Sequence, residues 1–214
     1  MSLPKLLLNN ILKKKKQSRF KENKEYFNKW AHTYDKYLFR WFMKRAQQKS
    51  IDLINKRNFS VLEVGCGTGE GLLMLKEATN GKIVGIDISD EMLKRARNKL
   101  KGKNINVKKA NVENIPYNNE TFDAVLSTES FHHYVNPRKA INEMKRVLKK
   151  GGNLIITDAN FYLPLFNKIM EKIEPGIVHI YNKKEMKKIF IQAGLKNIKQ
   201  KRTAFAFFIT KGVK

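Results

Sequence analysis

The sequence predicts a single α/β domain built on a mostly parallel β-sheet with helices on both faces. The 214 residues suit one domain, and from residue 61 onward short β-branched runs alternate with amphipathic stretches of helical length. Strands separated by helices lie parallel, because each crossover helix returns the chain to the same edge and covers a face of the sheet. Strands are expected at 61–65, 82–87, 104–109, 122–128 and 153–159, and helices at 71–78, 91–100 and 138–150.

Capping and breaking residues set the expected helix ends. Asp90 is the expected N-cap of the helix at 91–100. Pro137 suits the start of the next helix because its missing N–H costs nothing there, and Gly151 and Gly152 are expected to end that helix. The segment from Phe161 to Tyr181 shows the least regular pattern.

Residues 21–57, ahead of the sheet, predict one or two helices broken near Asp35. Their aromatic stripe is expected to be mostly core, and it comprises Phe27, Trp30, Tyr34, Leu38 and Trp41. We therefore expect a basic N-terminal extension at 1–20 and a single domain at 21–214. Within that domain, residues 61–158 form the predicted binding core, and 159–181 form a variable segment over the substrate.

The charge is strongly positive, with 44 basic and 19 acidic residues and a net charge of +25. Such a balance often indicates nucleic acid or an anionic membrane as a partner. Of the basic residues 35 are lysine, which favours a compositional origin instead. Residues 1–60 hold 16 basic and 4 acidic side chains, so any anion-facing surface is expected there.

The N-terminal stretch would place Leu3, Leu7 and Ile11 on one helix face, followed by Lys13 to Lys16. That pattern fits a helix lying on an anionic membrane surface, although a helix packed on its own domain or a frayed terminus is the favoured interpretation. No apolar run reaches the roughly 18 residues that a membrane-spanning helix needs. The single cysteine, Cys66, can form no internal disulfide, so we expect a cytoplasmic protein, and its spacing from the histidines predicts no metal site.

The strongest motif is VLEVGCGTGEG at residues 61–71, a strand that leads into three glycines and then a helix. Glycines let the backbone turn sharply and approach a ligand, and the helix start offers free N–H groups. A dinucleotide-binding loop would need glycine where Glu70 stands, so the loop is wrong for NAD. A glycine turn serving only packing is the alternative.

Asp87 ends the second predicted strand, VGID, at the edge where open α/β sheets bind ligands. An ionised carboxylate there can accept hydrogen bonds from the two adjacent hydroxyls of a ribose. Alone, it could instead be a helix cap.

Together these motifs resemble those of the class I S-adenosylmethionine-dependent methyltransferases. The acid and glycines of the loop match the family's E-x-G-x-G-x-G pattern, and KKANVENIPYNNETFDAVLST resembles the stretch before its fourth strand. YFNKWAHTYD and YNKKEMKKIFIQAGLKNIK resemble the first and last segments of small-molecule methyltransferases related to ubiquinone and menaquinone biosynthesis. The resemblance covers about residues 26–210.

The resemblance implies a doubly wound, Rossmann-like sheet of seven strands in the order 3-2-1-4-5-7-6, with the last strand antiparallel. It implies S-adenosylmethionine as cofactor, with Asp87 on the ribose and Ile88 and Met92 beside the adenine. Asn111 stands where the family usually has an aspartate that accepts from the adenine amino group. The implied cofactor residues are Tyr34, Glu63, Gly65, Cys66, Gly67, Gly69, Asp87, Ile88, Met92, Asn111, Val112, Ser127, Thr128 and His132.

Methyl transfer from a sulfonium is an in-line displacement that gains much from holding the reactants close and aligned. A base helps when the acceptor must lose a proton, and imidazole suits that task near neutral pH. His132 and His133 follow the fourth strand, and in similar families such a pair lines the pocket. Both could equally be structural, and His179 is a weaker candidate.

The leading functional hypothesis is methyl transfer to a small, hydrophobic acceptor. The predicted lid over that acceptor comprises Phe161, Tyr162, Leu163, Leu165 and Phe166. RNA or protein methylation is the first alternative, suggested by the basic N-terminal part. A protein that binds S-adenosylmethionine without turnover is the second.

Overall fold

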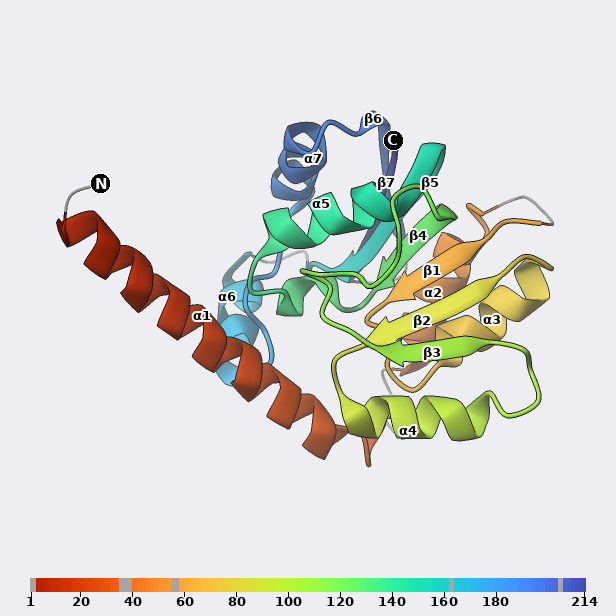
Figure 1. Cartoon of the computed structure of the whole chain (residues 1–214), viewed down its shortest axis with the longest axis horizontal. Helices are drawn as coiled ribbons and strands as arrows, with labels where there is room; N and C mark the ends of the chain where they lie inside the picture. The colour runs from red at the N-terminus through yellow and green to blue at the C-terminus, as the bar shows by residue number, and fades with distance from the viewer. Residues whose placement is uncertain (1–2, 35–39, 55–57, 162–163, 204–205) are drawn as a thin grey trace.

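The computed structural model describes residues 3–34, 40–54, 58–161, 164–203 and 206–214, with side chains from residue 14 onward and excepting Arg40. These residues form a seven-stranded sheet in the order β3-β2-β1-β4-β5-β7-β6 (Figure 1). Strands β1 to β5 pair in parallel, and β7 lies antiparallel between β5 and β6. The fold class and strand order implied by the sequence are confirmed. The strands are β1 Val61–Val64, β2 Ile83–Asp87, β3 Asn106–Lys109, β4 Phe122–Thr128, β5 Leu148–Ala159, β6 Lys196–Thr203 and β7 Phe207–Val213.

Helices cover both faces of the sheet because successive strand residues point to opposite sides. Leu62 and Val64 pack in a cluster with residues of α5 and α7, whereas Val61 packs with residues of α2, α3 and α4. The helices are α1 Leu3–Trp30, α2 Arg40–Ile51, α3 Glu70–Ala78, α4 Asp90–Lys99, α5 Pro137–Val147, α6 Pro164–Ile173 and α7 Lys183–Gln192, with a 3-10 turn, η2, at Phe131–His133.

Two expected helix ends are wrong. The N-cap of α4 is Ser89, whose extended backbone lets Oγ accept the Met92 N–H, while Asp90 is the first helical residue. Helix α5 starts at Pro137 as expected but ends at Val147, because the next residue pairs with Phe122 as the start of β5. Gly151 and Gly152 therefore lie within β5.

Helix α1 is one continuous helix of 28 residues (Figure 1). It crosses the carboxyl-terminal edge of the sheet and continues beyond the body of the domain toward the N-terminus. No described helix is long and apolar enough to cross a membrane.

The aromatic stripe was expected to be mostly core, but its described residues lie elsewhere. Phe27, Trp30 and Tyr34 line cavities, and Trp41 is 57% exposed. Leu38 lies outside the described residues. The segment predicted to be irregular contains the helix α6. Several large apolar side chains of this helix, from Leu165 to Ile173, are exposed.

Candidate active site

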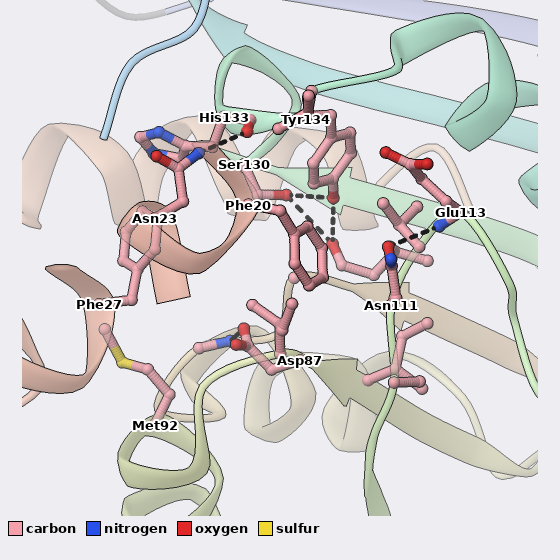
Figure 2. A pocket seen from close by; sticks show the side chains of 18 of the residues that line it. Phe20, Asn23, Phe27, Asp87, Met92, Asn111, Glu113, Ser130, His133 and Tyr134 are labelled. Atoms are coloured by element: carbon pink, nitrogen blue, oxygen red, sulfur yellow. Dashed lines mark hydrogen bonds between the residues drawn. The ribbon is translucent and has the colours of Figure 1, made fainter. Parts of the chain in front are cut away.

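The carboxyl ends of β1, β2 and β4 meet under α1 and line a cavity that opens to solvent (Figure 2). In this cavity, Phe20, Asn23 and Phe27 come from α1, facing Asp87 and Met92 across the opening. This position, where the strand order reverses between β1 and β4, is where open α/β sheets bind ligands.

The glycines after β1 have different roles. Gly67 has a φ of +52°, and a Cβ there would have only Tyr34 Cε1 near it, at 4.0 Å. Its open side faces the cavity, so backbone and ligand can meet closely. A Cβ on Gly65 would instead lie 2.5 Å from Ser130 Oγ, so this glycine is needed for packing.

Asp87 sits at the end of β2 with both carboxylate oxygens held by backbone. Oδ2 accepts the Gly67 N–H at 2.9 Å and Oδ1 accepts the Ser89 N–H at 2.8 Å. Each oxygen keeps a further acceptor position. Burial raises the pKa of Asp87 above its usual value, although these backbone N–H groups oppose the shift.

The far wall of the cavity is mostly apolar, with Ile88, Met92 and Val112 along it. Asn111 Oδ1 accepts the Glu113 N–H at 2.9 Å (Figure 2), which fixes the amide beside this wall. One acceptor position of the amide oxygen remains free for a ligand.

A smaller cavity continues behind the glycine turn and is lined by Glu63, Gln47 and Thr128. Glu63 Oε1 accepts from Gln47 Nε2 and Thr128 Oγ1, both at 3.0 Å. Its Oε2 is buried with no partner among the described residues. Burial raises the pKa of Glu63 to about 7. A buried acceptor without a partner suits a cationic group of a ligand.

A third cavity, here called the acceptor cavity, lies beside the first and shares Phe27, Tyr34, Glu129 and His133 with it. Its walls are mainly aromatic and aliphatic. They come from α1, α2, η2, the end of β5, α6, the segment after α6 and the start of β7. They include Tyr26, Trp30, Met43, Phe161, Phe166, Met170, Ile173, Ile177, Ile180 and Phe207.

His132 lies in the acceptor cavity, where its Nδ1 hydrogen-bonds with Asp158 Oδ1. Burial alone would lower the pKa of His132, but the Asp158 carboxylate and this hydrogen bond outweigh burial and raise it. The pair therefore favours an imidazolium held by a buried carboxylate.

His133 lines both cavities and has a different state. Its Nδ1 lies 2.8 Å from the Gly176 carbonyl, which can only accept, so Nδ1 carries the proton and Nε2 keeps a lone pair. Burial and the neighbouring His132 lower the pKa of His133 well below its ordinary value. The pKa values of the two histidines, which the sequence could not separate, are thus shifted in opposite directions.

Other predicted residues fall around these cavities. Cys66 and Thr128 line the small cavity, but Gly69 begins α3 against Ala96 and lines none of the cavities described here. Ser127 is enclosed in a hydroxyl cluster with Ser130 and Tyr134. His179 pairs with Glu171 and Glu185 at the surface.

Of the predicted lid, Phe161 and Phe166 line the acceptor cavity, whereas Leu165 is 70% exposed. Tyr162 and Leu163 lie outside the described residues.

Several cavity residues escaped the sequence analysis. Glu129 lines all three cavities. Phe20 and Asn23 line the first one, although Phe20 lies in the predicted N-terminal extension and Asn23 in the helices predicted ahead of the sheet. Glu129 could have been suspected, because it directly follows β4 at the ligand-binding edge. Asn23 gave no signal, since its role depends on how α1 docks, with Nδ2 donating to the His133 carbonyl at 2.9 Å.

The sheet order, the glycine turn after β1 and the acid at the end of β2 define a class I methyltransferase domain. The family model described as a methyltransferase domain matches residues 62–156.

An uncharacterized protein of Methanocaldococcus jannaschii is 34% identical over 188 residues, covering 84% of this chain and 85% of the relative. The demethylmenaquinone methyltransferase of Shouchella clausii is 28% identical over 167 residues, covering 65% of this chain and 71% of that protein. The solved structure of a Thermotoga maritima S-adenosylmethionine-dependent methyltransferase is similar with a TM-score of 0.74 and 23% identity, covering 89% of this chain and 99% of that one. Matches to two other Methanocaldococcus jannaschii proteins span only 52% and 62% of those relatives.

Residues 62–156 belong to the methyltransferase domain family, whose cofactor is S-adenosylmethionine, and the wider chain is similar to the demethylmenaquinone methyltransferases. The described residues fit S-adenosylmethionine. Gly67 leaves room at the turn, Asp87 offers acceptors for ribose hydroxyls, and the unpartnered Oε2 of Glu63 suits the ammonium of the amino acid end.

Proposed function

We propose that this protein transfers the methyl group of S-adenosylmethionine to a small acceptor with an apolar body. The acceptor cavity carries the proposal, because it is walled by apolar and aromatic side chains. It also opens directly on the first cavity, which holds Asp87 and Gly67 and is called the cofactor cavity from here on. Sharing Phe27, Tyr34, Glu129 and His133, the two cavities would bring an acceptor beside the cofactor.

The cofactor supplies an electrophilic methyl group on a positively charged sulfur. The protein has to hold the acceptor close and aligned, and this positioning can supply much of the acceleration. Tyr34 and Phe27 would do so at the junction of the cavities, while the apolar walls exclude competing water.

The site also offers groups that can handle a proton of the acceptor. His133 Nε2 has a free lone pair, whereas His132 is oriented by Asp158. We propose His133 and His132 as candidate catalytic residues, with His132 acting as the charged member of the pair.

Incubation with methyl-labelled S-adenosylmethionine and a mixed panel of phenols, amines, carbon acids, RNA and protein tests the proposal. Label should appear in small molecules with an apolar body. Label found only in RNA or protein would contradict the small acceptor, and cofactor binding without any transfer would indicate a protein that does not turn over.

A polymeric acceptor is the competing function. It is favoured by exposed lysines of α1, including Lys14, Lys15 and Lys21, on the helix that also walls the cavities. Such lysines could neutralise phosphates of RNA near the opening. In either case we propose a reducing, cytoplasmic setting, since Cys66 is a buried free thiol.

A further inference from the structure

The ionisable side chains that line the acceptor cavity differ from those of the protein as a whole. The chain carries 44 lysines and arginines against 19 acids, yet none of the described residues that line this cavity is lysine or arginine. Glu129 and Glu174 are the acids in its lining. His132 is paired with Asp158, so the two glutamates are the acids of the lining left to meet a ligand.

Glu129 is held in an unusual way for a side chain that only fills space. Its φ is +54°, in the left-handed region that favours glycine. Its N–H donates to the Thr157 carbonyl at 2.9 Å, which fixes this backbone at the junction of the cavities. Its Oε1 is buried without a hydrogen-bond partner among the described residues. A strained position that presents an unpartnered buried carboxyl to a cavity points to a ligand group that donates hydrogen bonds.

A second buried acid also has a carboxylate oxygen without a hydrogen-bond partner. Asp158 is 1% exposed, and its Oδ2 has no partner among the described residues although Oδ1 holds His132. Burial and the nearby Asp158 carboxylate raise the pKa of Glu129 well above its usual range, and burial also raises that of Glu174. A positive charge placed among these groups would relieve both the repulsion and the lost solvation.

The remaining walls also suit a cation. The rings of Tyr26, Phe27, Trp30 and Tyr34 come from α1 and its end, and Phe161, Phe166 and Phe207 stand on other elements of the same cavity. Faces of aromatic rings attract ammonium groups, most strongly where water is excluded.

We infer that the acceptor is a small amine with an apolar or aromatic body, whose ammonium is bound by Glu129 in the acceptor cavity. This inference rests on the proposed methyl transfer and specifies the acceptor atom as nitrogen. A phenolate or carboxylate head would face Glu129 and Glu174 and be repelled.

The reaction at nitrogen balances with Glu129 as the proton acceptor and the cofactor sulfur as the leaving group. The bound ammonium gives one proton to the Glu129 carboxylate and becomes a neutral amine with a lone pair. The nitrogen–carbon bond forms as the methyl–sulfur bond breaks, and the electron pair of that bond stays on sulfur. The product leaves as an N-methylammonium, and Glu129 returns its proton to solvent.

The test uses three probes of one shape, 2-phenylethylamine, 2-phenylethanol and 3-phenylpropionate, measured for binding by calorimetry and for methyl transfer with labelled cofactor. The amine should bind at least tenfold more tightly than the alcohol, and label should appear on nitrogen. Glu129→Gln should lower the affinity for the amine at least tenfold and leave the weak binding of the alcohol unchanged. Glu120→Gln is the matched control, because Glu120 has a similar φ of +56° but is exposed at the surface, and it should bind the amine normally.

The outcomes separate the two proposals. Amine and alcohol binding equally, tighter binding of the carboxylate, or unchanged amine binding in folded Glu129→Gln would overturn the amine assignment. Label on the oxygen or carbon of the wider panel would leave methyl transfer standing while the amine assignment falls. Glu129-dependent amine binding without label on any acceptor would support the cavity assignment and contradict the proposed methyl transfer.

Discussion

Asp87 is the residue on which cofactor recognition most depends. Asp87→Ala is expected to weaken S-adenosylmethionine binding by about 1.5–3 kcal/mol, the scale of hydrogen bonds to a charged group, without unfolding the protein. Calorimetry measures the loss. Asp52→Ala is the control, because Asp52 is an exposed carboxylate bonded only to Gln48 among the contacts described, and it should bind normally. Unchanged affinity in folded Asp87→Ala would leave Asp87 only its loop contacts with Gly67 and Ser89.

Gly67 and Gly102 allow backbone strain to be separated from occupation of the cofactor space. Both have positive φ, +52° and +77°, and a Cβ would have room at either position, but only Gly67 lines the cofactor cavity. Alanine at either position should cost about 1–2 kcal/mol of stability, because L-residues resist this backbone region. Only Gly67→Ala should also reduce cofactor affinity, and Gly67→Val should be harsher. Equal cofactor binding by folded Gly67→Ala and Gly102→Ala would show that the cofactor does not approach the backbone closely at Gly67.

Glu63 should make stability depend on pH. Its pKa in the folded protein is about 7, above the ordinary value of 4.5, so the folded state binds more protons than the unfolded state between these pH values. Stability of the cofactor-free protein should therefore fall as pH rises from about 4.5 to 7, by roughly 3 kcal/mol in total from this group. Cofactor affinity should rise over the same range, since the carboxylate is the form that pairs with an ammonium.

The difference between wild type and Glu63→Gln isolates this effect from the histidines. Denaturant unfolding at several pH values should show a shallower fall for Glu63→Gln. Parallel pH profiles of the two proteins would mean that Glu63 is not protonated in the folded state near neutral pH.

At the scale of elements, α1 is a functional wall rather than an appendage. It contributes Phe20, Asn23 and Phe27 to the cofactor cavity and is tied to α4 through Ser89 Oγ, which donates to Asn28 Oδ1 at 2.7 Å. The ion pair between Lys24 and Asp90, at 3.2 Å, adds a second tie. Order in α1 and cofactor binding should therefore be coupled.

Asn28→Ala tests this coupling. Losing the bond to Ser89 should cost about 1 kcal/mol, raise the cofactor dissociation constant several-fold and lower amide-exchange protection in α1. Lys29→Ala, an exposed change on the same helix, should alter neither. Reduced protection in α1 with unchanged cofactor affinity would show that cofactor binding does not depend on order in α1.

The parallel half of the sheet could be predicted because β1, β2 and β4 are short buried runs, each followed by a segment of helical length. The glycine turn and Asp87 could be placed because strand ends share one edge of the sheet. The end of α5 could not, since Leu148 continues a helical pattern and only its pairing with Phe122 makes it a strand residue. The acceptor cavity was equally hidden, because α1, α6 and the end of β5 are far apart in sequence and meet only in the fold.

For the whole molecule, the distribution of charge separates two surfaces. The acceptor cavity lacks basic side chains among its described lining residues, whereas residues 1–60 carry 16 basic and 4 acidic side chains. The part of α1 nearest the N-terminus projects away from the sheet (Figure 1).

Deleting residues 1–18 tests whether this projecting part binds an anionic surface. Leu3, Leu7 and Ile11 recur at helical spacing ahead of Lys13 to Lys16, a pattern that fits docking on anionic lipid. Full-length protein should sediment with anionic vesicles at roughly 0.15 M salt, where the screening length is about 8 Å, and the truncated protein should not. Cofactor affinity should persist, because the deletion removes the contact of Lys16 with Asn136 but keeps Phe20 and the bond from Arg19 to the Ile177 carbonyl at 2.8 Å.

RNA in place of vesicles provides the second arm of this experiment. If the lysines neutralise phosphates, truncation should lower RNA affinity and flatten its salt dependence, because fewer counterions would be released. Full-length protein that binds neither vesicles nor RNA at this salt concentration would show that the positive charge reflects composition alone. Binding that survives the deletion would place the anion-binding surface on the lysines that remain, since residues 19–60 still contain most of the basic side chains of this region.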